Sequence, residues 1–248
     1  MSCAAPLPRA LAAQLGMELR LTLRRGETLL ITLGVPLLLL LFFGSVPVLS
    51  AGEGRPVDFL VPGILALAVM STGMVGLGIA TAFERQYGVL KRLGGSPLPR
   101  YGLLLAKIGA VIVIELLQAV LLTGAAGLVL GWQLRGANIW ALLVVLLGTA
   151  TFAGIGLLMA GALRAEATLA GANGLYLVLL LLGDMVFPLG QLPAGLASLA
   201  RLLPAAALAD ALRATLQRGQ PPPLSALAVL VIWGALAIGA AARTFQWE

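Results

Sequence analysis

The residue types that carry most enzyme chemistry are scarce in this sequence. The chain has 248 residues, no histidine and one cysteine, Cys3. Hydrolytic mechanisms that use histidine, histidine metal sites and intrachain disulfides are therefore excluded. Charged residues make up 10% of the chain, whereas a soluble domain has about 25%. The sequence predicts neither catalytic nor metal-ligating residues, and a membrane enzyme without histidine has no evident site.

The densest group of charged residues lies between Glu84 and Arg100, in the sequence ERQYGVLKRLGGSPLPR. A valine and two leucines would form a small apolar face beside Lys91 and Arg92. This pattern is typical of a short helix that lies on a membrane surface or in a groove of a partner. Pro97 would end the helix, because proline cannot continue one. A basic turn held by anionic lipid headgroups is the alternative.

A few polar side chains stand inside or beside long apolar runs. Glu115 lies near the middle of one run, and Gln118 follows one helical turn later on the same face. Asn173 and Tyr176 share a face of another run, and Asp184 lies near its end. A charge at the bilayer centre is expensive and usually faces protein or water. Glu115, Gln118, Asn173 and Tyr176 are therefore candidates to line a pathway for a polar or cationic substrate. Alternatively, the Glu115 carboxyl is neutral or is paired with a group on another helix.

Hydrophobic residues make up 60% of the chain, and its charge-free runs are long. A helix needs about 20 apolar residues to span the hydrocarbon core. We therefore predict an all-α integral membrane protein with a single transmembrane domain, 1–248. Its six spans are predicted at 28–49, 59–83, 101–130, 138–163, 167–187 and 224–242.

Two segments differ from simple spans and loops. Leucine recurs every four residues from Leu7 to Leu23, with arginines off that stripe. This predicts a basic amphipathic helix over 6–25 that lies in the membrane interface. The segment 188–223 is interrupted by prolines, and its apolar stretches are too short to cross the membrane. We predict two short re-entrant helices there, on the outer side.

The positive residues predict which side of the membrane each loop faces. Six spans place both termini on one side, and cytoplasmic loops carry the excess of Lys and Arg. Eleven of the 16 basic residues fall on the side of the termini and the 84–98 connection, against five on the other. We expect a multi-pass protein of the plasma membrane with both termini in the cytoplasm. The net charge of the chain is +6, and we expect the excess basic residues to contact membrane lipid rather than nucleic acid.

The segment 84–98 resembles a signature of ABC transporter permeases of the type-2 exporter class. The matching positions are Glu84, Arg85, Gly88, Leu90, Lys91, Arg92, Leu93, Ser96, Pro97 and Leu98. A second match lies in the outer segment and includes Pro188, Pro193, Pro204, Asp210 and Arg213. With the amphipathic helix and the six spans, the resemblance covers essentially the whole chain, and it is to G-subfamily-like drug and antibiotic exporters.

The resemblance implies a role for each segment. The helix at 6–25 would be a connecting helix, 84–98 the coupling helix that contacts an ATP-binding subunit, and 188–223 an outer gate. It also implies that two permease chains, identical or different, pair around a central pathway and that each holds an ATP-binding subunit. The expected cargo is a hydrophobic or amphipathic small molecule, such as a drug, an antibiotic or a lipid.

The resemblance also requires the motor to lie in another polypeptide. A Walker A loop ends in Gly-Lys-Ser or Gly-Lys-Thr, but Lys91 and Lys107 follow leucine and alanine. No cofactor is expected in this chain, and ATP and Mg²⁺ are expected on the partner subunit. A secondary transporter that moves protons through Glu115 and Asp184 is the alternative, although no inverted repeat supports it.

Overall fold

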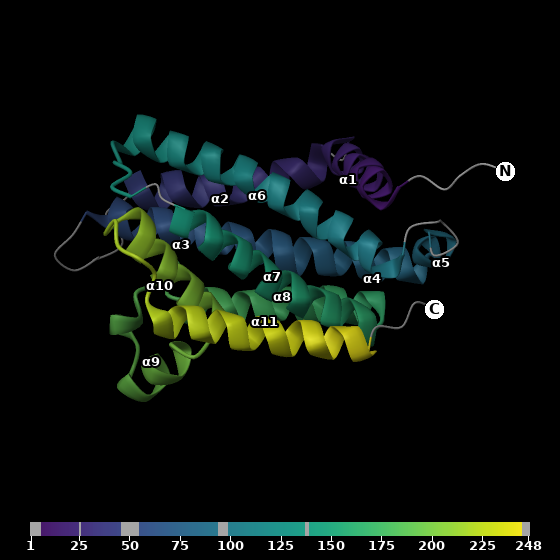
Figure 1. The fold of residues 1–248 in the computed structure, drawn as a ribbon. Helices are drawn as coiled ribbons and strands as arrows, with labels where there is room; N and C mark the ends of the chain where they lie inside the picture. The colour runs from purple at the N-terminus through teal and green to yellow at the C-terminus, as the bar shows by residue number, and fades with distance from the viewer. Residues whose placement is uncertain (1–5, 25, 46–54, 94–98, 137–138, 245–248) are drawn as a thin grey trace.

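The computed structural model describes residues 6–24, 26–45, 55–93, 99–136 and 139–244, and this part of the chain forms helices joined by turns, with no β-strand. Within it, five helices are long and apolar enough to cross a membrane. They are Pro56–Gln86, Tyr101–Leu130, Ile139–Ala162, Ala165–Leu182 and Leu224–Thr244. The predicted all-α integral membrane fold is confirmed, and Figure 1 shows the long helices running side by side.

The first predicted span, 28–49, corresponds to α2 (Gly26–Ser45). The apolar part of this helix, Leu30–Ser45, is shorter than the five long helices. Residues 46–49 lie outside the described part of the chain. By length and composition, a sixth crossing is counted only if the two bent helices Ala194–Ala200 and Pro204–Leu216 form one span. Because α2 is not counted as a span, its crossing of the membrane stays a prediction.

The second predicted span, 59–83, is the most buried helix of the bundle. It consists of α3 (Pro56–Met70), a π-helical turn η1 (Ser71–Gly76) and α4 (Leu77–Gln86). Proline suits the first position of α3, because its missing N–H group would have no partner within the helix. The span packs against α2, α6, α7 and α8. Its apolar residues on all sides fit this central place.

The next two helices, α6 (Arg100–Leu130) and α7 (Ile139–Ala162), complete the core around this span. Gly131 ends α6 in a left-handed conformation with φ of +62°, which glycine adopts without a steric penalty. Gly156 lets α7 approach the π-helical turn closely, because a Cβ there would lie 2.6 Å from the carbonyl oxygen of Met74. The last helix, α11 (Leu224–Thr244), packs along α7.

The fifth long helix, α8 (Ala165–Leu182), ends five residues before the predicted boundary at 187. The chain leaves the helix at Gly183, and Asp184 adopts a φ of +55°. Asp184 stabilises this turn by an ion pair with Arg213 and by accepting a hydrogen bond from the backbone N–H of Leu189. The charge-free run ends at Gly183, close to the end of the helix, and the predicted span is too long because it extends past Asp184 to 187.

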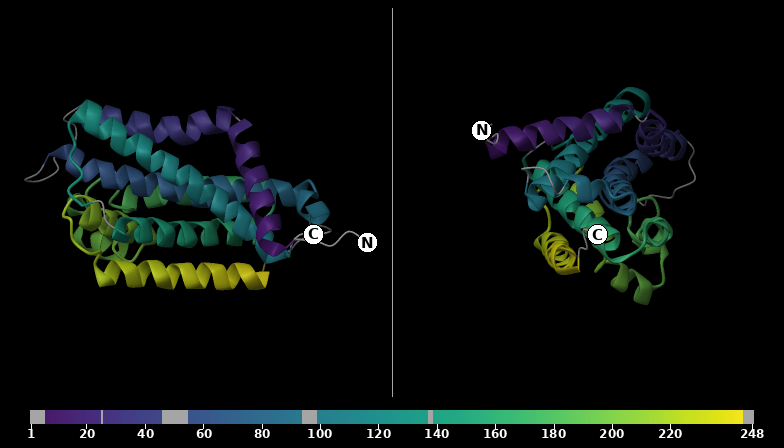
Figure 2. Two further views of the ribbon diagram at one scale, coloured as in Figure 1. Left: turned by 45° about the horizontal axis from the view of Figure 1, so that its top comes forward. Right: turned by 90° about the vertical axis from the view of Figure 1, so that its right-hand side faces the viewer.

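The two ends of the bundle carry different short helices. At one end α1 (Leu7–Arg24) crosses at a steep angle to the long helices and packs on α6, and α5 (Val89–Leu93) lies at the same end of the bundle (Figure 2). At the other end lie η2 (Leu189–Gln191), α9 (Ala194–Ala200) and α10 (Pro204–Leu216). The helices α9 and α10 are bent by 80° relative to each other, a geometry shared by broken spans and re-entrant segments, so the re-entrant assignment stays a prediction.

Candidate functional site

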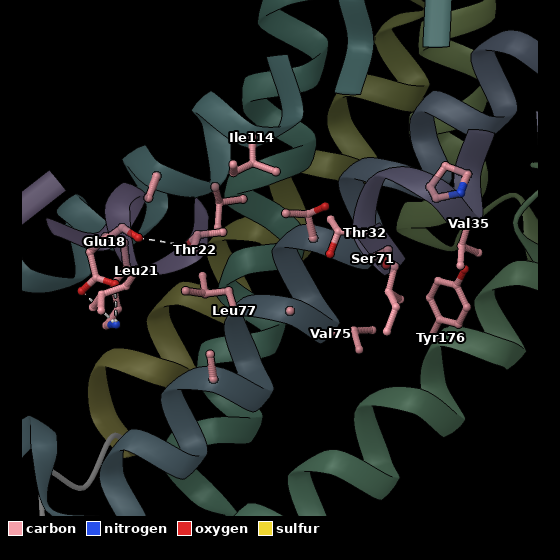
Figure 3. Close-up of a pocket in the computed structure, with 18 of the residues that line it drawn as sticks. Glu18, Leu21, Thr22, Thr32, Val35, Ser71, Val75, Leu77, Ile114 and Tyr176 are labelled. Atoms are coloured by element: carbon pink, nitrogen blue, oxygen red, sulfur yellow. Dashed lines mark hydrogen bonds and ion pairs between the residues drawn. The ribbon is translucent and has the colours of Figure 1, made fainter. Parts of the chain in front are cut away.

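A groove with a volume of about 390 Å³ lies between α1, α2, the η1–α4 segment, α6 and α8. Glu18 and Thr22 of α1 lie at one end of it, and Tyr176 of α8 lies at the other (Figure 3). Val75 and Leu77 form the wall between these ends, opposite Ile114. Every long helix except α7 and α11 contributes to the groove.

Two of the four predicted pathway residues line this groove. Asn173 and Tyr176 both come from α8. The amide nitrogen Nδ2 of Asn173 donates a hydrogen bond to the carbonyl oxygen of Leu169 at 2.8 Å. Asn173 is exposed, whereas Tyr176 is half-buried.

The other two predicted pathway residues, Glu115 and Gln118, lie behind the groove wall, and both are 2% exposed. Gln118 accepts a hydrogen bond from the hydroxyl of Thr72 at 3.1 Å, and its Nε2 donates to the carbonyl oxygen of Thr32 at 2.8 Å. Thr72 and Thr32 themselves line the groove. The hydroxyl of Thr149 donates to Glu115. These contacts connect α2, η1, α6 and α7 in the middle of the bundle.

A buried ion-pair cluster closes the groove at the end near α1. Nζ of Lys107 lies 2.7 Å from Oε2 of Glu84 and 3.1 Å from Oε1 of Glu18, and the lysine side chain is 4% exposed. The cluster connects α1, α4 and α6. Neither Lys107 nor Glu18 was singled out from the sequence as a site residue. The available signal was that Glu18 is the single acidic residue of a basic amphipathic helix.

The predicted coupling residues divide into an internal and an exposed group. Glu84 belongs to the ion-pair cluster. Arg85 donates hydrogen bonds to the carbonyl oxygens of Gly161 and Leu163, both at 2.5 Å, and thereby caps the end of α7, where carbonyl groups lack partners within the helix. Next to it, Nε2 of Gln86 donates to Glu166 of α8 at 2.8 Å. The internal group thus joins α4 to α6, α7 and α8.

The exposed group lies on α5. Gly88 turns the chain between α4 and α5 with a φ of +70°, and Leu90 anchors α5 because it is fully buried. Lys91 and Arg92 are exposed. Leu93 is the last residue of α5, and Pro97, the predicted end of the segment, lies outside the described residues.

The predicted outer segment is held by an ion pair. Arg213 bonds to the side chain and the backbone carbonyl of Asp184, and its guanidinium lies 4.0 Å from the centre of the Phe59 ring. The backbone N–H of Leu189 donates to Oδ1 of Asp184 at 2.8 Å. The contacts join the turn after α8 to α10 and α3, so Asp184 is bonded to this outer segment and not to Glu115.

The remaining predicted residues of the outer segment mark its helix boundaries or its surface. Pro188 precedes η2, Pro193 precedes α9, and Pro204 is the first residue of α10. Asp210 forms an exposed ion pair with Arg218 at 2.8 Å. An exposed pair of this kind adds little to stability.

A helical bundle with five helices long and apolar enough to cross a membrane defines a polytopic membrane protein. A family model described as ABC-2 type transporter matches residues 10–216. The chain belongs to this family and is a multi-pass membrane permease subunit of an ABC transporter. No curated protein matches the chain.

Proposed function

We propose that this chain is the permease of an ATP-driven exporter and that the end of the bundle with α1 and α5 faces the cytoplasm. A separate ATP-binding subunit would bind and hydrolyse ATP with Mg²⁺ and would dock on α5. Two permease chains would pair around the pathway. The cargo would be a hydrophobic or amphipathic small molecule, a class that includes drugs, antibiotics and lipids, and it would leave the cytoplasm by alternating access.

The observation that carries this proposal is the division of the 84–92 segment. Its basic residues Lys91 and Arg92 are exposed, whereas Leu90 is buried and Arg85 is bonded to the end of α7. A partner that binds the exposed face would therefore push on helices that are already joined to it. A coupling element needs this arrangement, because it must transmit movement from the partner to the long helices. A basic turn that only contacts lipid headgroups would not require the hydrogen bonds between Arg85 and the end of α7.

Movement of α5 would reach the groove through one continuous helix. The η1–α4 segment runs from the groove-lining residues Ser71 and Thr72 to Gln86, just before α5. Its π-helical turn contains one residue more per turn than regular helix, and such turns are frequent at functional sites. Displacement of α4 would change the wall of the groove, and this supports the groove as part of the pathway.

The proton-coupled alternative receives no similar support. Asp184 is bonded to Arg213 and to the backbone of Leu189, whereas Glu115 accepts from Thr149. Their contacts lie on different sets of helices. The hydrogen-bond partners of the two carboxyl groups thus differ, and no hydrogen bond between described residues joins Glu115 to Asp184.

The docking assignment is tested by charge reversal. We expect the double variant Lys91→Glu, Arg92→Glu to co-purify at least about tenfold less of a co-expressed ABC ATP-binding subunit that binds the unmodified chain, because close charge pairs at interfaces contribute on the order of 1.5–7 kcal/mol. The measurement is the ratio of the two subunits after affinity purification from detergent, together with the ATPase rate of the complex.

The matched control reverses two exposed arginines at the opposite end of the bundle. Arg135 and Arg201 are exposed, and the variant Arg135→Glu, Arg201→Glu is expected to retain the full complex. Equal losses in both variants, or a full complex after reversal at Lys91 and Arg92, would contradict docking on α5.

A further inference from the structure

The middle of the groove favours an apolar ligand. Leu21, Ile31, Val35, Val75 and Leu77 all line it. Hydroxyl groups line the groove at both ends: Thr22 lies beside Glu18, and Ser71 and Thr72 of η1 lie further from the ion-pair cluster. Binding sites for small molecules have this composition, with a mainly apolar wall and a few polar groups that orient the ligand.

The end of the groove near α1 carries an unbalanced charge. Among the described residues that line the groove, the charged ones are Glu18, Glu84 and Lys107. Two carboxylates therefore share one ammonium group. The lysine side chain is 4% exposed, against 13% for Glu18 and 22% for Glu84, so the carboxylates are the more accessible members of the cluster.

The described basic residues of α1 do not restore the balance. The basic residues of α1, Arg9, Arg20 and Arg24, are exposed and do not line the groove. Water and salt screen exposed charges over distances beyond about 8–10 Å. A partly buried carboxylate is screened much less, and an uncompensated charge in such surroundings is costly. A ligand that brings a positive charge to this end would remove that cost.

The size of the groove limits the ligand. Ser71 and Glu84 both line it and lie thirteen positions apart along one helix, which corresponds to roughly 20 Å at about 1.5 Å per residue. A volume of about 390 Å³ fits a compact molecule with several rings or a branched apolar body. A phospholipid with two long chains would have to leave most of its apolar part outside.

We propose that the groove selects an apolar organic cation, whose positive charge lies against Glu18 and Glu84 while its apolar body contacts the wall formed by η1, α2 and α6. This inference rests on the proposed function, because it assigns the substrate class of that permease. An anion of the same shape meets two carboxylates and is rejected. A neutral compound gains only the apolar contacts and binds more weakly than the cation.

Two ions of equal shape and opposite charge test the selection directly. Tetraphenylphosphonium is an apolar cation, and tetraphenylborate is the corresponding anion. Their binding to the full chain in phosphatidylcholine nanodiscs is measured by equilibrium dialysis without any ATP-binding subunit, and binding to empty nanodiscs is subtracted. We expect protein-dependent binding of the cation, and at least about tenfold weaker binding of the anion.

Substitutions in the groove separate charge from shape. Glu84→Gln removes one carboxylate and is expected to lower the ratio of cation to anion affinity by about tenfold. Ala80→Phe places a ring in the groove and is expected to reduce cation binding whatever the charge of the cluster. Asp58→Asn is the charge-matched control, because Asp58 lies in the first turn of α3 and does not line the groove. It is expected to bind both ions as the unmodified chain does.

Several outcomes would overturn the proposal. Equal binding of the two ions to the unmodified chain would contradict charge selection, as would an unchanged ratio in a folded Glu84→Gln variant. If Ala80→Phe abolishes pairing of two chains in chemical cross-linking and leaves cation binding unaltered, the occupant of the groove is the second copy. If Glu84→Gln does not fold, the Ala80→Phe result and the comparison of the two ions still test whether the groove binds an apolar cation.

Failure of this inference differs from failure of the proposed function. The binding assay contains no ATP-binding subunit, so cation binding persists even if no such subunit docks on α5. Conversely, if the ATP-binding subunit binds through Lys91 and Arg92 while both ions bind equally well, the permease assignment is supported and the apolar cation is rejected as the substrate class.

Discussion

At the scale of single residues, buried polar groups have definite partners. Gln118 is bonded on both sides, to Thr72 and to the backbone at Thr32. Glu115 accepts from Thr149 through one oxygen, whereas its other oxygen, Oε1, is buried without a hydrogen-bond partner. A buried polar group that loses its partner retains its full desolvation penalty. Glu115 is therefore the residue of this layer most sensitive to changes around it.

Removing the hydroxyl that bonds to Glu115 is expected to destabilise the protein. Thr149→Val keeps the shape of the side chain and leaves both oxygens of Glu115 without a donor, which lowers the free energy of unfolding by about 1–3 kcal/mol. The control is Thr123→Val, because the Thr123 hydroxyl donates to the carbonyl of Ala119 on its own helix. Thermal unfolding in detergent measures both. Similar unfolding temperatures for the two variants would show that Glu115 does not depend on Thr149.

At the scale of helices, close backbone contact holds the central span against α7. A Cβ at Gly156 would lie 2.6 Å from the carbonyl oxygen of Met74 and 3.0 Å from that of Gly73. Both of these residues belong to the π-helical turn. In a membrane, where lipid competes for apolar surface, small residues at helix contacts allow the packing that holds helices together. The contact places α7 directly beside the segment that we propose to move.

A single methyl group at this contact is expected to separate the helices. Gly156→Ala forces α7 or η1 to shift, and overpacking of this kind costs about 1–3 kcal/mol. Gly124→Ala is the matched control, because a Cβ at Gly124 meets nothing within 4 Å, and alanine is favoured over glycine in a helix by roughly 0.5–1 kcal/mol. Thermal unfolding should therefore fall for the first variant and stay level or rise for the second. The reverse order would mean that the helices are not in contact there.

The sequence predicted the long helices because their signal, a long apolar run without charge, is local. It also predicted that 84–98 contains a short helix that carries Lys91 and Arg92 beside an apolar face. It could not predict that Arg85 caps α7, since the two partners lie 76 residues apart. The bond between Lys107 and Glu18 joins residues 89 apart, and the end of α8 depends on Asp184 and Arg213. Such contacts arise only when the helices pack.

At the scale of the whole molecule, α5, the helix on which we propose that the ATP-binding subunit docks, and the groove belong to one connected unit of packed helices. The turn at Gly88 joins α5 to α4, and α4 continues through the π-helical turn into the groove wall. Arg85 adds α7 to this unit, and Lys107 adds α6 and α1. A displacement of α5 by a partner would therefore reach the groove through the turn at Gly88 and through α4. Chemistry by this chain itself is not required.

The central claim is that a separate ATP-binding subunit drives transport through this permease. The most direct measurement is uptake of labelled tetraphenylphosphonium and of the neutral dye Nile red into vesicles that contain both subunits, with ATP supplied on the side of that subunit. We predict accumulation of at least one probe with ATP. We predict none with a Walker A lysine substitution in the partner or with Lys91→Glu, Arg92→Glu in this chain. Uptake driven by a proton gradient without ATP, or no uptake of either probe, would contradict the claim.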